Sequence, residues 1–296
     1  MNTAAAVEQR HPLSSLIERI VAEREQSGLL TYWLLDRSAL PQGRWIKDWL
    51  AGDAAVDLLT GERSIEPDGV TPILVDARSL RGSSVRTHRN VDELVRVAAM
   101  SNTVSLLRST LALEALQVAL QARTRVVLPQ GLHAVLRYFD TRALPLLPRL
   151  LTPAQYAWMM QPVSHWYYLG RWGEVSQMPD PDSALLGTVP QVPIPLELDT
   201  AQEEMLLADG MTDAIIDMLL TMRHEALLHA SPPQQFERID PLVQQAGVIG
   251  FEDHADVFAF VGQALNRGDD FHVREPWAER FVRFRSGELS ADQVFE

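Results

Sequence analysis

Apolar positions follow a mixed pattern in the first part of the chain. Short apolar runs, which predict buried strands, alternate with segments whose apolar residues recur every three or four positions, which predict helices. The predicted strands are 29–35, 71–76, 104–107, 124–128, 132–139, 165–169 and 172–177. The predicted helices are 12–26, 91–100, 111–122, 141–151 and 153–160. The residues Pro129–Gly131 separate two of the strands and predict a hairpin.

The last hundred residues have a purely helical pattern. Met211, Ile215, Met218 and Met222 are spaced like one stripe of a helix. Further helices are predicted at 232–246, 254–266, 276–285 and 290–295. No run in this part alternates apolar and polar residues as a strand does.

The two patterns meet at a proline-rich segment, residues 178–196. Proline has no backbone N–H and a fixed φ, so this segment predicts an extended connector. Its prolines are Pro179, Pro181, Pro190, Pro193 and Pro195. We therefore expect a mixed domain at 1–177, a linker at 178–196 and a helical lobe at 197–296. Interleaved strands and helices fit both α/β and α+β. The hairpins favour α+β, with a small, mainly antiparallel sheet flanked by helices, plus an all-α C-terminal lobe.

Charge divides the chain at the same place. The net charge is −13 over 296 residues. Acidic and basic residues balance before Glu197, so residues 197–296 carry the whole excess. An acidic lobe repels phosphate, which argues against nucleic acid as a partner. Two interpretations of the acidity stay open: it keeps the lobe in solution, or it attracts a basic protein partner.

Composition further limits the kind of protein. The chain has no cysteine, which excludes disulfides, thiolate metal sites and thiol catalysis. The N-terminus lacks the basic and apolar regions of a secretory signal. No apolar run reaches the ~18 residues of a membrane span. We expect a cytoplasmic protein without membrane insertion.

No motif indicates catalysis, a cofactor or a metal. His224 and His229 are five residues apart, whereas the zinc-protease motif needs a spacing of four to place both rings on one helix face. Gly82, Ser83 and Ser84 do not form the Gly-x-Ser-x-Gly elbow of a serine nucleophile. The carboxylates are many, but their sequence positions indicate no tuned pair. We expect neither an enzyme nor a cofactor.

A charged corner joins the second hairpin strand to the following helix. Asp140 lies where a helix N-cap would lie, and either Arg137 or Arg142 is placed to pair with it. The corner has two interpretations, a structural joint or a contact for a protein partner. We take Arg137, Asp140 and Arg142 as candidate partner-binding residues.

Large side chains suggest two further surfaces. In the run 165–168, alternation places Trp166 and Tyr168 on one face of a strand, and one face is expected to be core. We take Trp166, Tyr168 and Trp172 as candidate partner contacts, because exposed aromatics are typical of binding hot spots.

The helical lobe begins with four methionines. Methionine suits adaptable binding surfaces, but its helical spacing here favours core. The four are Met205, Met211, Met218 and Met222.

The corner and its surroundings resemble the effector chaperones of type VI secretion, also called Tap or TEC adaptors. The family's corner is similar to residues 137–144 and is followed by Gln155, Pro162 and Trp166. Its strands resemble residues 32–36, 72–75 and 105–109, so the likeness covers residues 29–175. Thr141 replaces a usual proline and Gln161 a usual glycine, and both changes concern local geometry.

The resemblance implies a cytoplasmic adaptor that holds a toxic effector and helps to load it onto the VgrG spike. It implies binding alone, with the mixed lobe on one partner and the helical lobe tuning selectivity. Two rivals remain at this stage. One is a hydrolase whose carboxylates converge only in the fold, and the other is a structural component of the apparatus without cargo.

Overall fold

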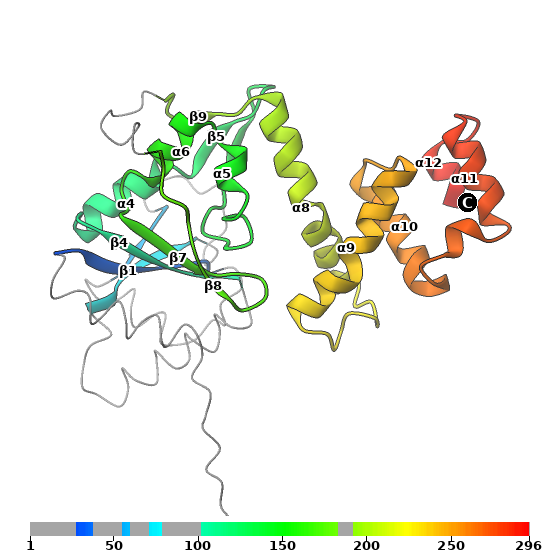
Figure 1. Cartoon of the computed structure of the whole chain (residues 1–296), viewed down its shortest axis with the longest axis horizontal. Coiled ribbons are helices and arrows are strands. Elements are labelled where there is room, and N and C mark those ends of the chain that lie inside the picture. Colours follow the sequence, from blue (N-terminus) through cyan, green and yellow to red (C-terminus); the bar gives the residue numbers. More distant parts are fainter. Residues whose placement is uncertain (1–27, 38–54, 60–70, 79–101, 183–191, 296) are drawn as a thin grey trace, which may run out of the picture. The chain divides into compact units, whose positions relative to one another are not determined.

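The fold is described from a computed structural model, which covers residues 28–37, 55–59, 71–78, 102–182 and 192–295. The chain forms two compact units, Met1–Glu204 and Met205–Glu296. Each is described by itself below (Figure 1). The predicted helices at 12–26 and 91–100 and the residues Gly82–Ser84 lie outside the described residues.

Unit 1 is built on a six-stranded sheet with the order β2-β3-β1-β4-β7-β8. Every neighbouring pair described is antiparallel. The strands are β1 (Leu30–Leu35), β2 (Ala55–Asp57), β3 (Ile73–Asp76), β4 (Val104–Ser109), β7 (His165–Leu169) and β8 (Val175–Gln177). Five of them were predicted. The three residues of β2 are too few to show a period of two, which is why the sequence pattern did not reveal that strand.

The predicted hairpin at 124–139 forms a second, smaller sheet. Its strands β5 (Arg125–Val127) and β6 (His133–Val135) are antiparallel, and Gly131 adopts the positive φ that the turn requires. A third strand, β9 (Leu196–Glu197), runs parallel to β5. The end of the proline-rich segment thus pairs with a sheet of unit 1, and the division between the units falls later, after Glu204.

Three helices of unit 1, α4 (Leu113–Gln121), α5 (Leu147–Leu150) and α6 (Pro153–Met160), lie on one side of the large sheet (Figure 1). Helix α6 begins as predicted, with Thr152 and Gln155 forming a capping box. The predicted helix at 141–151 is wrong. Only Leu147–Leu150 are helical there. Pro145 lacks the N–H group that a helix beginning at residue 141 would need, whereas Pro148 is tolerated because it lies in the first turn of α5.

Large aromatic side chains fill the space between this sheet and its helices. Trp166 and Tyr138 are fully buried and meet edge to face, with ring centroids 5.6 Å apart. The Tyr138 hydroxyl donates a 2.7 Å hydrogen bond to the carbonyl of Leu120 in α4. The burial raises the pKa of the Tyr138 phenol above its ordinary value.

Replacement of Tyr138 with phenylalanine is expected to act in opposite directions at neutral and alkaline pH. At pH 7 it removes one buried hydrogen bond and costs about 1 kcal/mol. An unfolded tyrosine loses its proton near pH 10, whereas the folded one keeps it. Tyr138 therefore lowers the stability of the wild type above that pH by about 1.4 kcal/mol per pH unit.

Tyr138→Phe lacks this alkaline loss, so the two stability curves are expected to cross near pH 11. Urea unfolding between pH 7 and pH 11.5 measures both curves. A variant that stays less stable than the wild type by a constant amount throughout would contradict the buried placement of Tyr138.

Unit 2 is entirely helical in the residues that the structure describes. Its elements are α8 (Thr200–Thr221, which begins in unit 1), α9 (Pro232–Ile249), α10 (His254–Arg267), the 3-10 turn η2 (Phe271–Val273), α11 (Trp277–Arg285) and α12 (Ala291–Phe295). Gly250 ends α9 in the left-handed region, and Asp253 caps α10 through the N–H of Ala255. The predicted α+β fold with a helical C-terminal part is confirmed. No helix among the described residues has the length and hydropathy that a membrane crossing needs.

Candidate protein-binding surface

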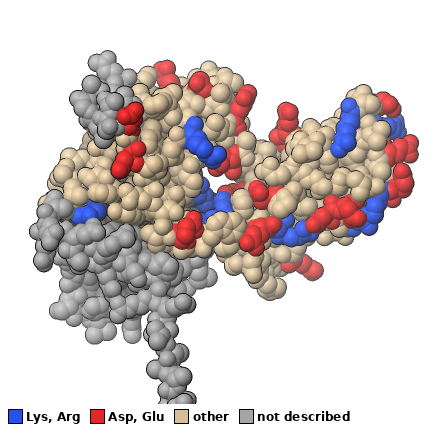
Figure 2. Space-filling view, viewed as in Figure 1, with Lys and Arg blue, Asp and Glu red and all other residues tan. Residues whose placement is uncertain are grey.

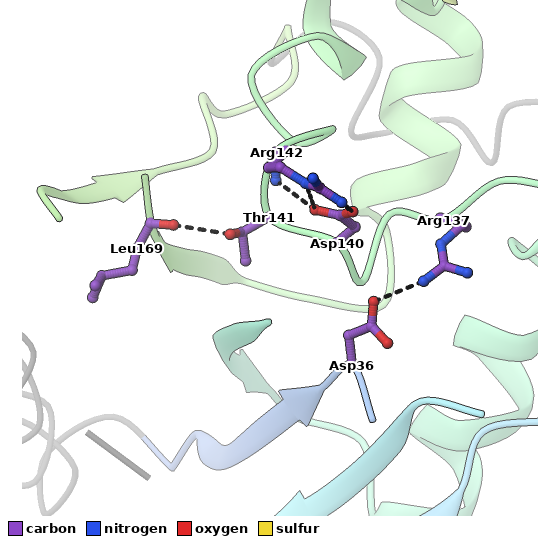
Figure 3. Close-up of polar contacts among 6 residues, drawn as sticks. All are labelled: Asp36, Arg137, Asp140, Thr141, Arg142 and Leu169. Carbon is purple, nitrogen blue, oxygen red and sulfur yellow. Dashed lines mark hydrogen bonds and ion pairs between the residues drawn. The ribbon is translucent and has the colours of Figure 1, made fainter. Parts of the chain in front are cut away.

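The predicted corner joins the small sheet to the end of the large one (Figure 3). Asp36 follows the last residue of β1 and is almost completely buried, and its Oδ2 accepts a 2.9 Å hydrogen bond from Nη2 of Arg137. The Arg137 guanidinium also lies 5.2 Å from the centroid of the Phe139 ring. One arginine thus connects the corner to the central strand of the sheet.

The second charged pair lies within the corner itself. Asp140 accepts hydrogen bonds from the backbone N–H of Arg142, at 3.0 Å, and from its guanidinium in a forked arrangement (Figure 3). The prediction that Asp140 caps a helix is wrong, because α5 begins only at Leu147. Asp140 instead closes a turn, and of the two arginines considered for it, Arg142 is the partner.

Thr141, between the two charged pairs, is the corner's buried anchor. Its hydroxyl donates a 2.9 Å hydrogen bond to the carbonyl of Leu169 at the end of β7, and its N–H donates to the carbonyl of Asn102. A proline in this position would have neither donor. This local difference from the related corner sequence therefore gives the chain two hydrogen bonds that hold the corner against β4 and β7.

The electrostatics of the corner suit a rigid binding surface. Both carboxylates are occupied by arginines, and the arginine side chains remain partly exposed, at 40% for Arg137 and 31% for Arg142. Held guanidinium groups with exposed edges are suited to carboxylates or carbonyls of another protein. Among the described residues, no three His, Asp or Glu side chains are grouped so that they would hold a metal ion.

The turn that follows β7 presents the exposed aromatic residue of this region. Trp172 is 54% exposed, and its backbone N–H donates to the Glu174 carboxylate. A Cβ at Gly170 would lie 1.9 Å from Oε1 of Glu174, so only glycine leaves room for this carboxylate. Leu169, which accepts the Thr141 hydrogen bond, precedes the turn directly. The corner and Trp172 are therefore held by the same strand end.

The other two aromatic candidates lie in the core. Trp166 is fully buried, and Tyr168 is 8% exposed. Burial also raises the pKa of the Tyr168 hydroxyl. Strand β7 is buried on both faces from Trp166 to Leu169, so the alternation assumed from the sequence gives no exposed face there. Trp172 is the exposed member of the three predicted aromatic contacts.

His224 and His229, whose spacing argues against a metal motif, lie between α8 and α9, outside both helices. One sequence interpretation of unit 2 changes with the structure. The prediction of a buried methionine cluster is wrong for three of its four members, because Met205, Met218 and Met222 are 40%, 37% and 69% exposed. The core side of α8 is formed by Ile215, Ile216 and Leu219 instead.

Asp36 is the residue of this site that sequence reasoning missed. Its signal was present, since an acidic residue directly follows a buried strand, but its partner is 101 positions away. Nothing in the local pattern indicates a pairing over that distance.

Replacing Asp140 with alanine is expected to cost about 1–2 kcal/mol, because the Arg142 N–H and guanidinium lose their acceptor. Asp140→Asn is the matched control. It keeps an acceptor for the N–H and loses the ion pair with the partly exposed Arg142 guanidinium, so a smaller cost of about 0.5–1 kcal/mol is expected. Thermal and urea unfolding of both variants measures the difference. Equal costs for the two would show that the turn hydrogen bond contributes nothing.

One comparison with known proteins gives a match for this part of the chain. Residues 31–157 match the model of a family described as "Domain of unknown function (DUF4123)". This range includes all of β1 except its first residue and the whole corner from Arg137 to Arg142, and it ends within α6. No curated protein and no solved structure matches the chain.

Proposed function

We propose that this protein is an adaptor that binds a type VI secretion effector and helps to load it onto the VgrG spike. It acts by binding alone, in the cytoplasm, without a bond made or broken on it. The observation that carries the proposal is the family match over residues 31–157, since that family is associated with effector adaptors of type VI secretion.

The geometry of unit 1 supports a binding role. The corner residues Arg137 and Arg142 are bound by carboxylates yet remain partly exposed, and Trp172 is exposed on the turn that follows Leu169, the residue to which Thr141 bonds. Arginine and tryptophan are the side chains most enriched at the centres of protein interfaces. Groups held in place before binding lose little conformational entropy when a partner docks.

The test is co-purification with the effector encoded beside the gene. A tagged copy of the full chain, co-expressed with that effector and separately with VgrG, is expected to retain the effector. In the presence of all three, a ternary complex is expected by size-exclusion chromatography. Arg137→Ala combined with Trp172→Ala is expected to reduce retention at least tenfold, whereas Leu132→Ala, on the exposed hairpin of the small sheet, leaves it unchanged.

Two outcomes would contradict the proposal. One is a folded protein, confirmed by circular dichroism, that retains neither protein. The other is turnover of a substrate by the purified chain that a single substitution abolishes.

A further inference from the structure

Two arginines of unit 2 share one tryptophan ring. Arg267 is the last residue of α10, and its guanidinium carbon lies 5.2 Å from the centroid of the Trp277 ring. The guanidinium carbon of Arg280, in α11, lies 5.5 Å from the same centroid. Arg267 is exposed, and Trp277 and Arg280 are half-buried. Aromatic rings attract guanidinium groups, so these three residues form one cluster, which we name the Trp277 site.

Each guanidinium group of the site is held by one hydrogen bond. Arg267 Nε donates to Oε1 of Gln263 at 2.6 Å, and Arg280 Nη1 donates to the carbonyl of Val294 at 2.9 Å. The Arg267 carbonyl accepts a 2.7 Å hydrogen bond from Nη2 of Arg274, which ties the end of α10 to the segment that leads into α11. Side chains that are held before binding lose little conformational entropy when a ligand docks.

The other donors of the site have no acceptor in the part of the chain that the structure describes. They are Nη1 and Nη2 of Arg267, Nε and Nη2 of Arg280, and the indole N–H of Trp277. Glu275 and Glu279 lie on either side of Trp277 in the sequence, but neither forms an ion pair with the two arginines. A guanidinium presents its N–H groups in a fixed planar fork that fits a carboxylate. The site therefore has the donors for an anion and lacks the anion.

The charge of the unit specifies what kind of anion fits. Residues 205–296 have sixteen acidic and seven basic residues, and acidic side chains are spread over the visible face of this unit (Figure 2). Three of its arginines are paired with carboxylates of the same unit, namely Arg238, Arg274 and Arg283. Such surroundings repel a polyanion such as a nucleic acid. A single carboxylate carries one charge and gains charge-assisted hydrogen bonds on contact, and it is repelled least when its own neighbours are uncharged or basic.

We propose that the Trp277 site binds a protein partner through one aspartate or glutamate side chain that is surrounded by uncharged or basic residues. The partner's carboxylate accepts hydrogen bonds from the free guanidinium N–H groups, and an apolar neighbour packs on the exposed part of the indole. Arginine and tryptophan together are typical of the centres of protein interfaces. This inference concerns unit 2 alone and goes beyond the adaptor function, which is argued from unit 1.

The site is tested by titrating the isotopically labelled full-length chain with three peptides and following the tryptophan indole N–H signals by NMR. The peptides consist of leucine and lysine and differ only at the central residue, which is glutamate, glutamine or phosphoserine. The signal that is lost in Trp277→Phe identifies the Trp277 indole. The glutamate peptide is expected to shift this signal until it saturates, and the glutamine peptide is expected to bind at least tenfold more weakly. The phosphoserine peptide is expected to bind no more tightly than the glutamate peptide, because its second negative charge meets the acidic surroundings.

Substitutions in the site are compared with a control of equal charge. Arg267→Gln combined with Arg280→Gln is expected to weaken the glutamate peptide at least tenfold. Arg223→Gln combined with Arg285→Gln removes the same charge at exposed positions outside the site, and unchanged binding is expected. Arg267→Gln alone leaves the hydrogen bond of Arg280 intact, so it remains informative if the double variant does not fold. At least threefold weaker binding is expected for it.

Equal affinity for the glutamate and glutamine peptides would overturn the proposal, and so would equal losses in the site and control variants. An indole signal of Trp277 that stays unmoved at saturating peptide would place the contact elsewhere and also overturn it. A phosphoserine peptide that binds at least tenfold more tightly than the glutamate peptide would make this a phosphopeptide site instead of a carboxylate site.

Discussion

Replacing Arg123 with methionine is expected to destabilise unit 1 by about 3 kcal/mol, because three helix carbonyl groups lose a charged donor. Arg123 is 4% exposed and lies just after α4. Its guanidinium donates to the carbonyls of Trp158 and Met159 at the end of α6 and to that of Ala119 in α4, at 2.5–3.1 Å. It also stacks over the Trp158 ring at 4.2 Å.

The effect is large because one cation donates hydrogen bonds to carbonyls in the last turns of two helices. The last carbonyls of a helix have no partner within it and carry partial negative charge, so a buried cation there satisfies both needs. Burial nevertheless lowers the pKa of Arg123 to about 10, which shows that removing the guanidinium from water has a cost. The carbonyls offset that cost only while the guanidinium is present. Methionine removes this donor from all three, and the Trp158 carbonyl keeps only a 3.4 Å bond from the N–H of Gln161.

The measurement is urea unfolding followed by tryptophan fluorescence. Among the described tryptophans, only Trp277 lies in unit 2, so the signal reports mainly on unit 1. Arg285→Met, at an exposed position at the end of α11, is the control and is expected to stay within about 0.5 kcal/mol of the wild type. Arg123→Lys keeps the charge but lacks the planar guanidinium that reaches several carbonyls at once, so an intermediate loss of stability is expected. A loss below 1 kcal/mol for Arg123→Met would show that the two helix ends find other donors.

Trp166 and Trp172 are six positions apart, but their replacement with alanine is expected to affect different properties. The first replacement lowers stability, and the second lowers affinity for the effector. Trp166→Ala opens a cavity beside Tyr138 and is expected to cost about 3–5 kcal/mol of stability. Trp172→Ala removes an exposed ring, while its backbone N–H still bonds to Glu174, so stability is expected to change by no more than about 0.5 kcal/mol. If Trp172 anchors the partner, effector affinity falls by about 2 kcal/mol, which is roughly thirtyfold.

The two variants separate packing from recognition because each has its own readout. Unfolding measures the first, and titration of the proposed effector partner onto the folded protein measures the second. Leu132→Ala is the control for exposed apolar residues in unit 1. If Trp172→Ala binds the effector with unchanged affinity, the turn after β7 is not part of the interface. Loss of stability in Trp172→Ala comparable to that of Trp166→Ala would contradict its exposed placement.

Much of the fold follows from local sequence signals. Strands β1, β3 and β7 are short, mainly apolar runs, and the hairpin of β5 and β6 follows from the turn at Gly131. The capping box of α6, the Asp253 cap of α10 and the glycine after each of α9 and α10 mark helix ends within a few residues. These features depend on the dihedral angles and hydrogen bonds of neighbouring residues, so they are legible in the chain itself.

The errors arose where a residue's surroundings come from distant parts of the chain. Periodicity places Met218 and Ile215 on overlapping stripes of α8, but only the packing of α9 decides that Ile215 is buried and Met218 exposed. Likewise, alternation along β7 predicts one exposed face, and only the elements packed on both sides of the sheet remove it. The helix expected after Asp140 is a different, local error, because Pro145 was visible in the sequence and its missing donor outweighed the helical spacing.

By itself, the sequence determined most of the strands and helices, that the last part is helical and acidic, and that 137–142 is a charged corner. These are properties of residue type and short-range spacing. Only the tertiary structure decided that Arg137 pairs with Asp36, that Trp166 is core while Trp172 is exposed, and that Ile215 of α8 is buried while Met218 is exposed. Such facts depend on contacts between residues far apart in the chain, and helix and strand propensities do not describe those contacts.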